Sequence, residues 1–226
     1  MKVRLVSYSQ PAEDFAKSVE VLPTAQDLVA YCARVSNPSN QMNTETSEKL
    51  LKYLIKHKHW SPFEMVSACL EIETTRDIAH QIVRHRSFSF QEFSQRYADP
   101  AEFGEQFVTR EARLQDVKNR QNSVETDNAE LRVKWQAHQE TVIKAAEKAY
   151  KWAIDNGIAK EQARVVLPEG CTKTRLYMNG TLRSWIHYID LRSDNGTQKE
   201  HMEIAHACAE VISKIFPNIM SFVDEG

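Results

Sequence analysis

The chain has 226 residues, 42% of them hydrophobic, and its 29 basic and 31 acidic residues leave a formal net charge of −2. This composition predicts one globular domain over residues 1–226, and it argues against sequence-independent nucleic-acid binding, which needs a net basic surface. Because the start lacks the apolar core of a signal peptide and no later run reaches the roughly 18 apolar residues of a membrane span, we expect a cytoplasmic protein.

Hydrophobic periodicity and capping residues predict five elements in the first half of the chain. In chain order they are a strand over 1–8, a helix from Thr24 that ends before Pro38, a helix over 46–58, a strand over 66–73 and a helix over 75–86. The strand over 66–73 alternates apolar with polar residues and is typical of a half-buried strand. Thr74 and Asp77 are expected to cap the helix that follows it.

The second half begins with a polar segment over residues 99–128, which we expect to be a variable surface loop with short helices. The later elements are a helix over 129–156 closed by Gly157, a short helix over 160–167, a strand over 172–180, a helix over 181–192 and a last helix that ends at Pro217. Asn179-Gly180 is expected to form a turn, and Thr197 with Glu200 a capping box.

The segment RHRSFSFQEFSQRY, residues 84–97, follows the helix predicted over 75–86. It places three arginines, one histidine, three serines, one glutamate and four aromatic rings within fourteen residues. Guanidinium groups match phosphate or carboxylate oxygens in pairs, and ring faces suit planar groups. Gln81 and Arg84 are neighbours on one helical face. The segment therefore predicts a site for something anionic.

Three interpretations of this segment are open from composition alone. It could be a basic helix end that offsets the helix dipole, a single-stranded nucleic-acid platform, or a small-molecule site. Glu92 either neutralises the arginines or accepts hydrogen bonds from a ribose hydroxyl or a base N–H. The balanced charge of the chain weakens the nucleic-acid interpretation.

The order of the residues distinguishes these interpretations. The string Arg84-His85-Arg86-x-x-Ser89-x-x-x-x-Ser94-x-Arg96 resembles the defining motif of the flavin-dependent thymidylate synthases. The resemblance extends to four other segments in the expected order: ARVS at 33–36, HWSPFE at 59–64, ARVVLP at 163–168 and LRSWIHYIDLRS at 182–193.

The resemblance implies an enzyme that makes dTMP from dUMP with methylenetetrahydrofolate as carbon donor, NADPH as reductant and FAD as cofactor. It also implies an α+β fold with a small antiparallel sheet and several long helices, and a homotetramer whose active sites are shared between subunits. Such enzymes use no cysteine nucleophile. The four separated cysteines are then expected to be buried small apolar residues: Cys32, Cys69, Cys171 and Cys208.

The resemblance also implies roles for individual residues. The residues matched to dUMP contacts are Gln81, Arg84, Glu92, Phe93, Ser94, Gln95, Arg96, Arg164 and Arg192. Arg96 is expected to meet the phosphate, and Arg192 is expected to carry the chemistry by favouring ionisation of uracil at N3, because a nearby cation lowers the pKa of an acidic group. The residues matched to FAD contacts are Ser36, His59, Ser61, Glu64, Arg84, His85, Arg86, Glu92, Thr181, Arg183 and His187.

Several points stay open or are excluded. Gln91 and Gln95 stand where relatives often have asparagine and glycine, which leaves the fine contacts of the dUMP loop open. His57 with His59, or His201 with His206, lack the spacing of metal ligands, so no metal site is expected. The alternatives are a non-catalytic nucleotide or single-stranded RNA binder that uses the Arg84–Tyr97 platform, and a flavoenzyme for another pyrimidine nucleotide.

Overall fold

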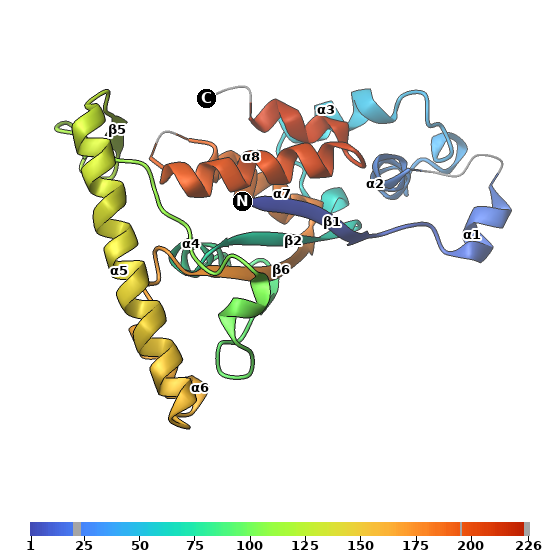
Figure 1. The fold of residues 1–226 in the computed structure, drawn as a ribbon. Helices are drawn as coiled ribbons and strands as arrows, with labels where there is room; N and C mark the ends of the chain where they lie inside the picture. The colour runs from blue at the N-terminus through green and yellow to red at the C-terminus, as the bar shows by residue number, and fades with distance from the viewer. Residues whose placement is uncertain (20–23, 195, 224–226) are drawn as a thin grey trace.

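A four-stranded antiparallel sheet in the order β1–β2–β6–β3 lies at the centre of the computed structural model, which describes residues 1–19, 24–194 and 196–223 (Figure 1). The strands are β1 (Lys2–Tyr8), β2 (Ser67–Thr75), β6 (Lys173–Thr181) and β3 (Ser89–Glu92). Apolar residues alternate along β2 and β6, so that one row of side chains, including Leu70 and Met178, is fully buried. The expected small antiparallel sheet is confirmed.

Two C-terminal helices, α7 (Leu182–Arg192) and α8 (Lys199–Ser213), pack on the sheet and on each other (Figure 1). The main core forms between them and includes the fully buried side chains of Trp185, Tyr188 and Phe216. The remaining helices of the body are α1 (Glu13–Ser18), α2 (Ala25–Ala33), α3 (Ser47–Lys56) and α4 (Arg76–Ile82).

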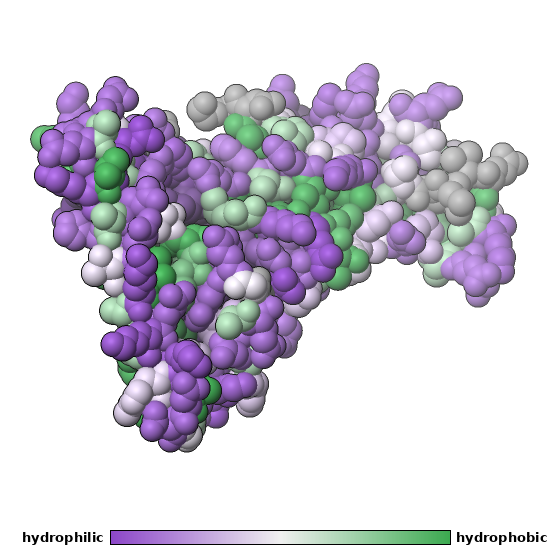
Figure 2. Space-filling view, viewed as in Figure 1, coloured by the Kyte–Doolittle hydropathy of each residue, from purple (hydrophilic) through white to green (hydrophobic). Residues whose placement is uncertain are grey.

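The long helix α5 (Ala129–Asp155) runs beside the body (Figure 1). The hairpin of β4 (Arg113–Gln115) and β5 (Ser123–Glu125) lies near one end of α5, and α6 (Lys160–Ala163) lies at the other. A second, smaller core lies under it and contains Phe107, Tyr150, Ala153 and Leu167. The face of the molecule in Figure 2 is mostly hydrophilic, and apolar surface gathers between α5 and the body. None of the helices in the described ranges has the length and apolar character needed to cross a bilayer.

Local capping chemistry confirms several predicted helix ends. Thr24 forms a reciprocal capping box with Asp27 at the start of α2, and the Thr181 hydroxyl accepts a hydrogen bond from the Ser184 amide at the start of α7. Gly157 has a φ of 76° and donates to Ile154, so it ends α5 in the left-handed conformation that favours glycine.

Two predicted helix boundaries are wrong. Helix α4 begins after Thr75 rather than Thr74, and it ends at Ile82, so residues 84–86 lie in the turn that follows. The capping box of Thr197 and Glu200 does not form, because α8 begins at Lys199 and the Glu200 carboxylate is bonded to other residues.

Three segments for which no strand was predicted contain strand residues. Residues 89–92 form β3, which pairs with β6 at the edge of the sheet. Asn179-Gly180 is not a turn, since β6 stays paired with β2 through Thr181 and leads directly into α7. The segment 99–128 was expected to be a loop with short helices. It holds a 3-10 helix, Pro100–Phe103, and also the hairpin of β4 (Arg113–Gln115) and β5 (Ser123–Glu125).

Gly180 is required by a neighbouring ring rather than by a turn. A Cβ atom at Gly180 would lie 2.4 Å from Cδ1 of Phe88. The Phe88 ring cannot retreat easily, because it packs against Trp185 with 4.8 Å between ring centroids. Gly180 therefore allows the turn before β3 to close against β6.

We predict that Gly180→Ala lowers the free energy of unfolding by about 1–3 kcal/mol, because overpacking displaces the Phe88 ring. Gly170→Ala is the matched control, since a Cβ there meets no atom within 4 Å. Chemical denaturation monitored by tryptophan fluorescence gives both values. Equal stability of the two variants would contradict the packing argument.

Candidate active site

The end of α7 and the turn after α4 bring two of the predicted site residues into contact. Arg192, the last residue of α7, donates a hydrogen bond from Nε to Nε2 of His85 over 3.0 Å. The His85 ring meets the Tyr188 ring edge to face, with 4.9 Å between centroids. Within the described ranges the two η nitrogens of Arg192 form no hydrogen bond, so they remain available to a ligand.

His85 is neutral in this contact. Burial, and to a smaller extent the positive charge of Arg192, lowers the pKa of His85 from 6.5 to about 4. Because Nε2 accepts the hydrogen bond from Arg192, the ring proton must be on Nδ1. The positive charge at this point of the site therefore comes from arginine alone.

Arg84 and Arg86 flank His85 and are both exposed. Neither guanidinium forms a hydrogen bond or an ion pair with any residue in the described part of the chain. These two exposed guanidiniums, on either side of the half-buried His85, are therefore available to an anionic ligand.

Gln81 lies on α4 and is half-buried. Its Nε2 donates to Oε1 of Gln198 over 2.8 Å, and its Oε1 lies 3.3 Å from Nδ1 of His201. His201 is fully buried, and its Nε2 lies 3.1 Å from the Tyr188 hydroxyl. Sequence reasoning missed His201 as a site neighbour. The sequence feature that could have identified His201 is its position on the apolar face of the last helix.

Glu92, the last residue of β3, is held by two partners that the sequence did not reveal. Its Oε1 accepts hydrogen bonds from Nη1 of Arg76 over 3.2 Å and from Oγ1 of Thr174 over 2.9 Å. Glu92 thus does not pair with the arginines of the 84–97 segment. Its Oε2 accepts no hydrogen bond from the described residues, which leaves this oxygen free for a ligand.

The aromatic rings of the 84–97 segment do not form a stacking platform. Such a platform needs rings side by side on the surface. Phe88 is buried in the main core, and Phe90 packs against the same core. Tyr97, in contrast, is 75% exposed. The rings of this segment therefore anchor the turn rather than bind a strand of nucleic acid.

A second cationic group forms where the 94–97 segment meets α6. Arg96 Nε lies 3.3 Å from Oε2 of Glu161, and Arg164 is half-buried without an ion pair in the described ranges. Arg164, Arg76 and Gln95 line a cavity of about 420 Å³. The Gln95 side chain is 3% exposed, and its Nε2 has no hydrogen-bond partner among the described residues. A buried donor without a partner is costly, so this amide is suited to donate to an acceptor oxygen of a ligand. Two carboxylates, Glu161 and Glu169, line the same cavity as the two arginines.

The residues matched to FAD gather at the 3-10 helix Ser61–Glu64 and the first half of α7. Arg183 forms an ion pair with Glu64, and the His187 ring meets Trp60 at 4.7 Å between centroids. Burial, and then the charge of Arg183, lowers the pKa of His187, so that this ring is neutral at pH 7. The other matched residues of this region are exposed: Ser36, His59 and Ser61.

The nucleotide-matched residues are split within one chain. Gln81 and Arg84 lie on either side of the end of α4, and Arg192 lies at the end of α7. No hydrogen bond, ion pair or ring contact in the described ranges joins Gln95, Arg96 or Arg164 to the pair of Arg192 and His85. Among the described residues, the nucleotide-matched side chains therefore form two groups without a direct contact between them.

The cysteines are not placed for nucleophilic chemistry. Cys208 is buried as expected, whereas the other three are half-buried, which corrects the expectation for Cys32, Cys69 and Cys171. Burial raises the pKa of all four thiols. A thiol with a raised pKa carries little thiolate at neutral pH and is a poor nucleophile.

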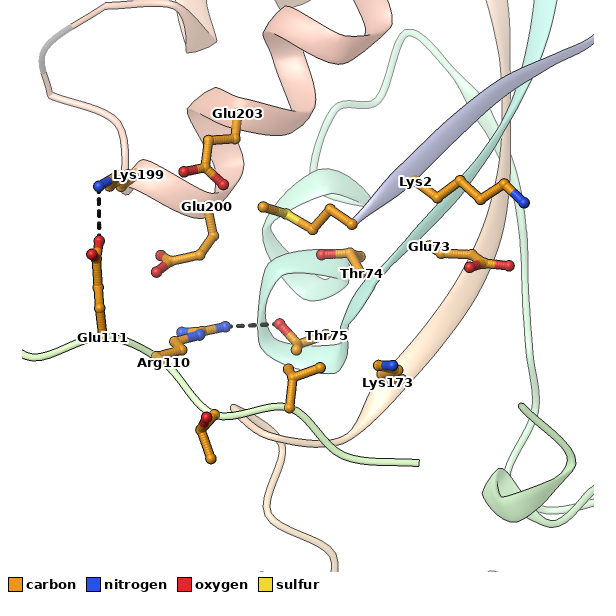
Figure 3. A pocket seen from close by; sticks show the side chains of 13 residues that line it. Lys2, Glu73, Thr74, Thr75, Arg110, Glu111, Lys173, Lys199, Glu200 and Glu203 are labelled. Atoms are coloured by element: carbon orange, nitrogen blue, oxygen red, sulfur yellow. Dashed lines mark hydrogen bonds and ion pairs between the residues drawn. The ribbon is translucent and has the colours of Figure 1, made fainter. Parts of the chain in front are cut away.

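Another cavity, of about 510 Å³, lies between the start of β1, the end of β2 and the start of α8 (Figure 3). None of the predicted site residues lines it. Two of its cations are bonded locally: Arg110 donates to Thr75 over 2.7 Å and Lys199 to Glu111 over 2.8 Å. Glu200 forms part of its wall. Among the described residues, no group of three or more histidine, cysteine or acidic side chains is placed to hold a metal ion.

Comparison with solved structures supports the fold. The chain is similar to the crystal structure of a UMP/dUMP methylase, PolB from Streptomyces cacaoi, bound with 5-Br dUMP. The TM-score is 0.78 with 24% sequence identity, over 99% of this chain and 94% of the other. At this level of identity the likeness concerns the fold, and it confirms the expected α+β architecture.

Comparison with protein sequences identifies the family. Residues 17–218 match the family model Thy1, described as thymidylate synthase complementing protein. The chain is 49% identical over 224 residues to a probable flavin-dependent thymidylate synthase of Paramecium bursaria Chlorella virus 1, with 99% of both chains covered. It is also 49% identical over 225 residues to the flavin-dependent thymidylate synthase of a Synechocystis species, which covers 99% of this chain and 100% of the relative. The chain therefore belongs to the flavin-dependent thymidylate synthase family.

Proposed function

We propose that the chain converts dUMP to dTMP, with methylenetetrahydrofolate as carbon donor and with NADPH-reduced FAD as hydride donor. The observation that carries this proposal is the contact of Arg192 with His85. In this contact the guanidinium is held through Nε, and neither η nitrogen has a partner among the described residues. Arg84 and Arg86, the neighbours of His85 in the sequence, also have no partner in the described ranges. Three arginines around one histidine suit a substrate that becomes anionic during the reaction.

Arg192 has the role of stabilising the N3-deprotonated form of the uracil ring. A guanidinium keeps its proton at any working pH, so it acts as a fixed positive charge and lowers the pKa of an acid beside it. Deprotonation raises the electron density of the ring and prepares it for one-carbon and hydride transfer. Neutral His85 orients Arg192 without adding a second charge that would repel it.

The nucleotide is held by residues from both parts of the split site. Gln81, Arg84 and Arg192 face it on one side. The cavity lined by Arg164 supplies the other, with Arg164 and Nε2 of Gln95 as donors to the phosphate. Arg96, whose partner Glu161 lines the same cavity, is the further phosphate contact in this proposal. The remaining dUMP contacts in this proposal are Glu92, Phe93 and Ser94.

The donor set also fits FAD. The guanidiniums of Arg84 and Arg86, which have no partner among the described residues, suit its diphosphate. The half-buried His85 and the exposed His187, both with a lowered pKa, suit its planar ring. The residues proposed to hold it are Ser36, His59, Ser61, Glu64, Arg84, His85, Arg86, Glu92, Thr181, Arg183 and His187. When bound, FAD supplies hydride chemistry that no protein side chain offers.

The split site supports an assembly in which subunits share each active site. We propose a cytoplasmic homotetramer of single-domain chains, in which Arg96 and Arg164 of one subunit complete the site formed around Arg192 of another. The lack of a direct contact between the two groups in the described part of one chain supports this arrangement.

Arg192→Ala is expected to keep FAD but to lower dUMP-dependent turnover by about a hundredfold or more, because a preorganised charge is lost from the transition state. Anaerobic assays with dUMP, methylenetetrahydrofolate and NADPH measure the rate, and flavin absorbance measures retention. Arg132→Ala, on the exposed side of α5, is the control. Near-normal turnover of the Arg192 variant would refute its role.

Arg96→Ala and Arg164→Ala are each expected to weaken dUMP binding by about tenfold or more, because a charge-assisted hydrogen bond contributes roughly 1.5–3 kcal/mol. Calorimetric titration of the FAD-loaded protein gives the dissociation constants. Arg120→Ala changes an arginine of the surface hairpin and should leave them unchanged. Unchanged affinity in both site variants would contradict the proposed phosphate contact.

The lowered pKa of His85 predicts a pH dependence of stability. Between the unfolded pKa of about 6.5 and the folded pKa of about 4, the unfolded chain binds more protons, so stability falls as the pH falls through this range. His85→Gln should lose less stability than the wild type between pH 7 and pH 5 in urea denaturation. His138→Gln, on the exposed face of α5, should behave as the wild type. Identical losses in all three proteins would contradict a neutral buried His85.

A further inference from the structure

A chain of hydrogen bonds runs behind the Arg192 site from α7 to the surface hairpin. Tyr188 contacts His201, His201 contacts Gln81, and Gln81 donates to Gln198. Nε2 of Gln198 then donates to Oε2 of Glu200 over 2.9 Å. The chain thus joins α7, α8 and α4, and it ends at a carboxylate in the wall of the cavity in Figure 3.

Glu200 sets the direction of every hydrogen bond in this chain. Its Oε1 accepts from Nη2 of Arg113 over 2.5 Å, and a carboxylate paired with arginine is an acceptor only. Gln198 must therefore turn its amino group toward Glu200 and its carbonyl toward Gln81. The same rule then turns the amino group of Gln81 toward Gln198 and its carbonyl toward His201.

His201 is the donor that completes this order. Burial is the main cause that lowers its pKa to about 3, so the ring is neutral and carries one proton. Since Oε1 of Gln81 accepts, that proton must be on Nδ1, and Nε2 must accept from the Tyr188 hydroxyl. Burial raises the pKa of Tyr188, which keeps its proton available for this bond.

The reversed order is excluded by the same geometry. If the Gln81 amide turned over, Gln198 would have to turn as well and would place its carbonyl oxygen 2.9 Å from a Glu200 oxygen. Two acceptors at this distance repel, and buried unpaired polar groups cost about 1–3 kcal/mol each. The amide of Gln81 therefore has one orientation.

The fixed amide makes Gln81 a donor to its ligand. Its carbonyl is occupied by His201 and one amino hydrogen by Gln198, which leaves one N–H on a half-buried side chain. We propose that His201, anchored by Tyr188 and by the Glu200 end of the chain, is a positioning residue that presents this N–H of Gln81 to an acceptor oxygen of dUMP. The inference rests on the proposed function, which places dUMP at Gln81.

Two variants of His201, whose new side chains have nearly the same size and shape as each other, test the inference. His201→Asn keeps a donor close to the position of Nδ1, whereas His201→Leu removes it. We expect the Leu variant to weaken dUMP binding by about tenfold and the Asn variant by less than about threefold, although both lose contact with Tyr188. Glu200→Gln, which removes the obligate acceptor, should weaken binding in the same direction.

A double-mutant cycle separates positioning from a general structural effect. In a Gln81→Ala background, His201→Leu should change the dUMP dissociation constant of the FAD-loaded protein less than about twofold, because its effect passes through Gln81. Equal losses in the Asn and Leu variants, or an undiminished effect of Leu in the Gln81→Ala background, would overturn the inference. Wild-type protein that does not bind dUMP at all would instead refute the proposed function.

Discussion

The hydrogen bond from Arg192 to a neutral His85 is the constraint on which the site depends. Two elements far apart in the sequence, α7 and the turn after α4, must meet within 3.0 Å to form it. Burial keeps the imidazole uncharged, so that it can accept this hydrogen bond and hold the guanidinium without repelling it. The η nitrogens of Arg192 form no hydrogen bond with the described residues, and in the proposed function they face the uracil ring from a fixed position, which is the condition for electrostatic stabilisation of a charge that develops during reaction.

The sheet and the two C-terminal helices hold the two residues of this contact in place. Strand β6 leads directly into α7, and Gly180 lets the Phe88 ring close the turn that carries His85. Behind the site, Glu200 orders the hydrogen bonds that reach Gln81. Arg113, which pairs with Glu200, comes from the hairpin within residues 99–128. A segment that had no expected role is thus connected to the site by an ion pair.

The sequence alone predicted the elements with strong local signals and the family motif. Thr24, Thr181 and Gly157 cap their helices as expected, because capping depends on a few adjacent residues. Predictions failed where partners far away in the sequence determine the local structure. Glu200 matched a capping box but is bonded to Arg113 and Gln198, and Asn179-Gly180 matched a turn but is paired inside the sheet. Arg76 and His201 could not be recognised, since their contacts with Glu92 and Gln81 exist only in the folded chain. The assigned contacts of dUMP and FAD stay predictions.

Nitrogen NMR of protein labelled at histidine tests the protonation state of His85 most directly, with His85→Gln used to assign its signals. At pH 7 the account predicts a neutral ring with the proton on Nδ1 and an Nε2 that accepts a hydrogen bond, and Arg192→Ala should shift the Nε2 resonance. A charged imidazolium at pH 7, or a proton on Nε2, would contradict the account, because Nε2 could then not accept the hydrogen bond from Arg192.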